Sequence, residues 1–143
     1  MIRGRISSSI DDLNILNRQY NWIPNENTIR PTQADLEYKW ALIDSIRIGW
    51  PSMKEYIWKE VLKESNKEWV FSPSIFRYKI PEEANHWVLW NTLSDFNREF
   101  DDSIINTVLE GFIGKNVEFA WYKNPKPSVP EYYHIQVFWI HLI

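Results

Sequence analysis

The last third of the chain most constrains what this sequence can fold into. Residues 117–123 and 133–139 are rich in β-branched and aromatic side chains, and a loop with three prolines separates them. This pattern predicts an antiparallel hairpin with a stiff connection. With Lys123 opposite Tyr133, alternate positions form an unbroken apolar face, whereas a slip of one residue would mix the two faces.

This pairing determines which side chains share each face of the hairpin. One face is apolar, with the pairs Trp121–Ile135, Phe119–Val137 and Val117–Trp139. The other face carries the pairs Tyr122–His134, Ala120–Gln136 and Glu118–Phe138. We therefore expect Trp121 and Trp139 to be buried together in the core, and His134 to lie in an aromatic and polar setting. Residues 85–91 also have strand composition with apolar side chains in both directions, which predicts a central strand of the same sheet.

The first half of the chain predicts a helical hairpin over residues 32–62. Its first helix runs to about residue 48, and the 3.6-residue spacing places its core stripe at Leu36, Trp40, Ile43 and Ile46 or Arg47. Ser52 and Glu55 form a capping box for the second helix. A helical turn over residues 94–100 and a helix from its cap Asp102 to Phe112, ended by Gly114, are also expected. The fold class is α+β, with an antiparallel sheet of about three to four strands packed against this hairpin and one further helix.

Composition bounds the class of protein. With 44% hydrophobic and 16% aromatic residues, residues 1–143 predict one globular domain, with an irregular arm at 1–9 and a sheet-forming region at 76–143. The net charge of -3 argues against a nucleic-acid partner. The lack of cysteine excludes disulfides and thiolate metal sites, and the sequence has no apolar run that would span a bilayer. We expect a soluble, cytoplasmic protein without a membrane partner.

A resemblance to a known family rests on three short motifs. They are the His86-Trp-Val-Leu-Trp90 strand, the Trp121-Tyr-Lys-Asn-Pro125 strand end and the Ser128-Val-Pro turn before His134, with Tyr78 upstream. On these residues the chain resembles the fungal N-acetylglucosamine-induced protein family, whose biochemical activity is not established. Arg77 departs from the proline that this family has before its tyrosine, and the loop between Pro125 and Ser128 is short.

His86 and His134 are the candidate catalytic residues, because histidine near neutral pKa is the usual acid–base group. Lys123 and Asn124 could present an ammonium and an amide to a phosphate or a sugar carboxylate. The predicted ligand-binding residues are Tyr78, Tyr122, Lys123, Asn124 and Ser128. No cofactor and no metal site are predicted, since no compact ligand motif occurs. The structural alternative is that each histidine satisfies one hydrogen bond under aromatic neighbours, and that Asn124 and Ser128 belong to a solvated turn.

Two functions therefore stay open. In the first, a phosphorylated or sugar-like metabolite binds around the two histidines, and one of them acts as a general base. In the second, the domain is a non-catalytic accessory or structural subunit of a larger assembly, and exposed tryptophans contact a protein partner. The many Ile and Asn residues are typical of an AT-rich genome, that of a microbial eukaryote or a large DNA virus. Whether His86 and His134 share a reachable cavity distinguishes the two functions.

Overall fold

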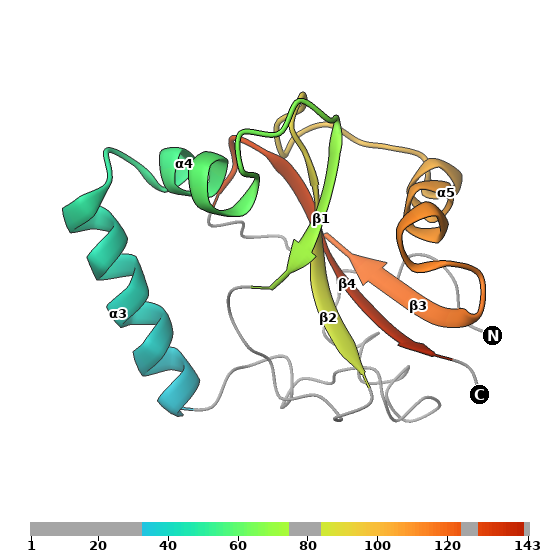
Figure 1. Cartoon of the computed structure of the whole chain (residues 1–143), viewed down its shortest axis with the longest axis horizontal. Coiled ribbons are helices and arrows are strands. Elements are labelled where there is room, and N and C mark those ends of the chain that lie inside the picture. The colour runs from blue at the N-terminus through green and yellow to red at the C-terminus, as the bar shows by residue number, and fades with distance from the viewer. Residues whose placement is uncertain (1–32, 75–83, 124–128, 142–143) are drawn as a thin grey trace.

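The computed structural model describes residues 33–74, 84–123 and 129–141, with side chains from residue 37 onward. Within these ranges the protein is an α+β domain with an antiparallel sheet and helices on both of its sides (Figure 1). The helical elements are α3 (Gln33–Gly49), α4 (Met53–Tyr56), its π-helical continuation η1 (Ile57–Val61) and α5 (Asp102–Ile113). The strands are β1 (Trp69–Pro73), β2 (Asn85–Asn91), β3 (Val117–Tyr122) and β4 (Tyr133–His141).

The sheet has the order β1-β2-β4-β3, and every neighbouring pair is antiparallel. The three strands predicted from the sequence are all present, and β2 and β4 occupy the centre. β1 and β3 are the outer strands, and β1 ends at Pro73, which has no N–H to donate. The predicted fold class is therefore confirmed. No helix in the described ranges has the length and apolar content needed to cross a lipid bilayer.

The face of the sheet under α5 carries the main hydrophobic core. Period-two alternation brings the odd-numbered side chains of all four strands to this face. Trp121 and Trp139 are both buried there, at 2% and 6% exposure, as predicted. Ile105 and Leu109 from α5 pack into the same cluster. The Trp121 indole also donates a hydrogen bond of 3.1 Å to Asn106 of α5, which ties the helix to β3.

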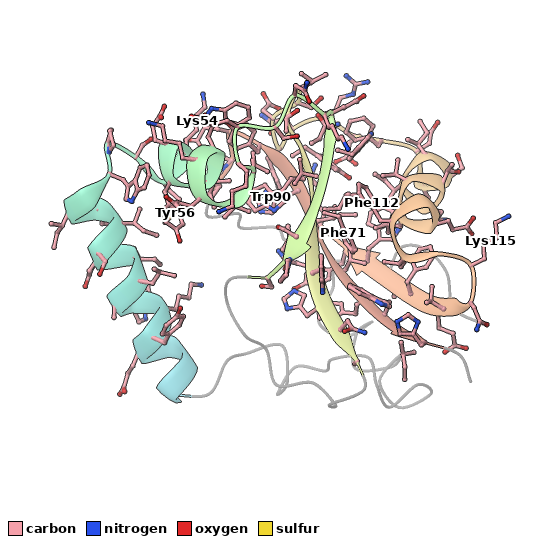
Figure 2. All side chains as sticks on the ribbon, in the orientation of Figure 1. Lys54, Tyr56, Phe71, Trp90, Phe112 and Lys115 are labelled. Atoms are coloured by element: carbon pink, nitrogen blue, oxygen red, sulfur yellow. The ribbon has the colours of Figure 1, made fainter. Side chains whose placement is uncertain are left out.

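The opposite face meets the helical hairpin at one end of β2. Val88 and Trp90 pack there against Ile57 and Leu62. Ser52 accepts a hydrogen bond of 3.2 Å from the Glu55 amide, so the predicted N-cap of α4 is present. Figure 2 shows Trp90 on the side of the sheet that faces Tyr56, while Phe71 and Phe112 lie on the α5 side. Apolar side chains therefore pack on both faces of the sheet.

The predicted core stripe of α3 is partly wrong. Ile43 and Ile46 are buried, but Trp40 is 56% exposed and Arg47 is exposed as well. Ile43 and Ile46 lie about 60° apart on a helical projection, whereas Trp40 lies about 60° beyond Ile43 on the side away from Ile46. The buried stripe is therefore rotated toward Ile46 and away from Trp40 relative to the predicted one, and Leu36 has no described side chain.

Three local predictions also need correction. The β3–β4 pairing differs from the expected one by two residues, so Trp121 pairs with Val137 and Tyr122 with Gln136. A shift of two keeps each side chain on its face, which is why the face assignment holds while the partners change. Residues 94–100 contain a turn at Phe96 and Asn97 and no helical turn; the Asp95 side chain accepts a hydrogen bond from the Asn97 amide at 2.9 Å, which stabilises that turn. Helix α5 begins at Asp102 with Asp101 as its N-cap residue.

Candidate functional site

The two candidate catalytic histidines lie on the same face of the sheet but not side by side. His86 of β2 pairs with Phe138, whereas His134 of β4 pairs with Trp90. His134 and Phe138 are four residues apart on β4, so the two imidazoles are separated by about 13 Å along the strands. The pair of Val88 and Gln136 lies between them.

His86 is held by a neighbouring amide and an aromatic ring. Its Nε2 donates to the Gln136 Oε1 oxygen at 2.7 Å, and its ring stacks on Phe138 with centroids 4.6 Å apart. Burial lowers the pKa of His86 to about 4, against the smaller opposing effect of the Gln136 hydrogen bond. The imidazole is therefore neutral at pH 7, and it is a weak base compared with the pKa near 7 that suits general base catalysis.

His134 is 6% exposed and lies between two aromatic rings. Its ring stacks on Trp90 at 4.6 Å and contacts Phe96 at 5.5 Å. Its Nδ1 donates to the Tyr132 carbonyl at 3.0 Å, which leaves Nε2 as the acceptor in the neutral ring. Burial lowers the pKa of His134, the Tyr132 carbonyl opposes this, and the charge of Lys123 lowers it further. Both histidines thus have the contacts expected of structural histidines beneath aromatic neighbours.

The Lys123 ammonium already has an ion-pair partner and a hydrogen-bond acceptor within the protein. It lies 3.0 Å from the Glu99 carboxylate and donates to the Arg98 carbonyl at 3.2 Å. It also lies 4.4 Å from the centre of the Phe96 ring, and its side chain is only 11% exposed. Lys123 therefore connects the segment of residues 96–99 to the end of β3. Its ammonium does not face solvent, where it could bind an anionic ligand.

Of the other predicted ligand-binding residues, only Tyr122 lies within the described residues, and it is buried. Tyr122 is 4% exposed, and its ring lies parallel to Phe138 at 6.0 Å. Tyr78, Asn124 and Ser128 lie outside the described residues. Within the described ranges, no three acidic or histidine side chains converge as ligands for a metal ion.

A groove that the sequence did not predict lies between β1 and α5. We call it the edge groove. Its volume is about 380 Å³, and it is lined by Lys67, Glu68, Trp69, Val108, Gly111 and Phe112. Phe112 is 47% exposed, and its ring lies 5.3 Å from that of Phe71 on β1. Both side chains are labelled in Figure 2. At Gly111 a methyl group would meet no atom within 4 Å, so the helix surface is open there. The lining is mainly apolar, with charged groups at one end.

The edge groove is adjacent to the outer edge of β1. The main-chain N–H and C=O groups of Trp69 and Phe71 point away from β2 and form no hydrogen bond within the described residues. An outer strand with such groups can pair with another chain. An apolar groove thus lies directly beside an unpaired main-chain edge.

Comparison of the chain with protein-family models, with curated proteins and with solved structures finds no match. The resemblance to the N-acetylglucosamine-induced family therefore stays a prediction from the sequence motifs. The geometry of the described residues is what distinguishes between the two functions.

Proposed function

We propose that this domain is a non-catalytic binding module of a larger protein assembly, and that it contacts its partner through the edge groove. The observation that carries the proposal is the position of the groove beside the outer edge of β1, which pairs with no strand among the described residues. An outer strand can pair with another chain, and the apolar groove beside β1 could take side chains of such a partner. This combination favours the accessory-subunit function over the metabolite site.

The residues around the groove fit a protein contact. Trp69 packs against Phe100 and Tyr133, with ring centroids at 5.0 and 6.2 Å, so this side chain is held in place before any partner arrives. Phe112 supplies an exposed aromatic surface on the opposite wall. Aromatic side chains that are anchored in this way are common binding hot spots, because little side-chain entropy is lost on association.

The histidine face supports the metabolite function less well. Both imidazoles have lowered pKa values, and the Lys123 ammonium is paired with Glu99. The remaining support is a pair of buried polar atoms, Ser72 Oγ and Trp90 Nε1, which form no hydrogen bond within the described structure. Both atoms are buried, so a small polar ligand would reach them only if neighbouring side chains moved, and a metabolite site is therefore the second candidate.

A binding selection tests the proposal. Peptides are selected from a random library displayed on phage, and their Kd values are measured by fluorescence anisotropy. We expect Phe112→Ser to weaken binding at least tenfold, since it removes an aromatic wall of the edge groove, and tenfold corresponds to about 1.4 kcal/mol. Leu93→Ser is the matched control, because Leu93 is 77% exposed and is not part of the groove lining.

Both variants are first compared with the wild type by thermal unfolding, so that a loss of fold is not mistaken for a loss of binding. The proposal is overturned if the selection gives no binder. It is also overturned if the selected peptides bind the Phe112→Ser variant as tightly as the wild type.

A further inference from the structure

We infer that the partner supplies an extended segment that adds to β1 as a further antiparallel strand, with apolar side chains at alternate positions and an acidic residue beside Lys67. This inference rests on the proposed function and specifies what its partner must present. It follows from the hydrogen-bonding direction of β1, from the side chains of the edge groove and from the charges at its end.

The main chain of β1 shows which residues would pair with the new strand. The Thr92 amide donates to the Glu68 carbonyl at 2.8 Å, and the Ser74 amide donates to the His86 carbonyl at 3.3 Å. In an antiparallel ladder, residues alternate between bonding one neighbour and the other. The even positions of β1 therefore bond to β2, and the odd positions Trp69 and Phe71 direct N–H and C=O outward. Only an extended chain offers donors and acceptors with this spacing.

The same two positions direct the partner's side chains toward α5. Trp69 and Phe71 both lie on the α5 face of the sheet. Residues directly opposite them on an added strand point to the same face, because side chains alternate with period two. These side chains would lie over Val108 and Phe112 in the edge groove. The partner residues that form the hydrogen bonds are thus also the ones whose apolar side chains fill the groove.

The charges beside the edge groove favour an acidic residue at the C-terminal end of the added strand. All pairs in the sheet are antiparallel, so an added antiparallel strand would run its C-terminal end toward residue 67. The Glu68 carboxylate accepts a hydrogen bond of 3.1 Å from the Asn91 amide, whereas the Lys67 ammonium forms no ion pair within the described residues. A carboxylate at this end would pair with Lys67. Pro73 limits the other end, since it offers no N–H.

The test uses a designed peptide, acetyl-Thr-Val-Thr-Leu-Thr-Glu-amide, whose Leu and Val would lie opposite Trp69 and Phe71. Hydrogen exchange of backbone amides is followed by NMR with and without saturating peptide. We expect exchange at Trp69 and Phe71 to slow at least tenfold. The amides of Val70 and Ser72 serve as internal controls, because they are already bonded to β2.

A second arm tests the charge. Replacing the terminal Glu of the peptide by Lys should weaken binding at least fivefold, and Lys67→Glu should reverse this preference. If peptides selected on the wild-type protein bind the edge groove while Trp69 and Phe71 stay unprotected, strand addition is wrong and the binding module stands. If the charge preference does not reverse, the assignment of the acidic residue is wrong. If no peptide binds at all, the proposed function itself fails.

Discussion

His86 should make the protein sensitive to mild acid. Burial lowers the pKa of the folded imidazole to about 4, whereas histidine in an unfolded chain titrates near 6.5. Between these values the unfolded state binds more protons than the folded state, so the free energy of unfolding falls as the pH falls. The stability that depends on a neutral His86 ring is fully present above about pH 6.5. It decreases as the pH falls from there toward 4.

The size of this effect follows from the two pKa values. For a single site with pKa of about 4 folded and 6.5 unfolded, the free energy of unfolding drops by about 2 kcal/mol between pH 7 and pH 5. With a urea m-value of about 2 kcal/mol/M, the unfolding midpoint falls by roughly 1 M. The lowered pKa of His134 acts in the same direction.

Urea titrations followed by tryptophan fluorescence at pH 7 and pH 5 measure this loss. His86→Gln should lose much less stability than the wild type over the same interval, because the titrating ring is absent. His141→Gln is the matched control, since His141 is exposed at the end of β4. An equal loss in the wild type and in His86→Gln would refute the argument, because the acid sensitivity would then arise elsewhere.

Substitutions at three further positions have expected outcomes. Trp121→Ala should lower the free energy of unfolding by roughly 3–5 kcal/mol, measured by urea unfolding. Trp121→Phe should lower it by at least about 1 kcal/mol, since the bond to Asn106 and part of the buried ring are both lost. An unchanged midpoint in Trp121→Ala would contradict its place in the core. Lys123→Met should raise the pKa of His134 in an NMR titration, because the nearby positive charge is removed; an unchanged or lower pKa would contradict this effect of the charge. Ser52→Ala should cost about 1 kcal/mol, since α4 loses its N-cap, and an unaltered melting temperature would argue against that cap.

The sheet and its faces could be predicted because a period of two is a strong signal. In the stretches around Trp121 and Trp139, alternation alone assigns each side chain to core or to the opposite face. The pairing partners could not be predicted, because shifting Trp121 from Ile135 to Val137 leaves every side chain on its face. β1 was not predicted as a strand, because it is short and ends at Pro73.

The candidate site was predicted less well than the fold, since it depends on contacts between distant residues. Whether His86 and His134 share a face, and how far apart they lie, depends on the β2–β4 register, which the sequence does not determine. Lys123 meets Glu99 across 24 residues of chain, and no local pattern signals that pair. The edge groove likewise forms where residues 67–69 meet residues 108–112 in space. The exposure of Phe112 near the end of α5 is visible only in the structure.

The most direct test of the central claim is a map of the peptide contact on the protein. Backbone amide shifts of isotope-labelled protein are recorded by NMR as a phage-selected peptide is added. The edge-groove account predicts that the largest shifts occur at Trp69, Phe71, Val108 and Phe112. Largest shifts around His134, or on the exposed side of α3, would contradict it.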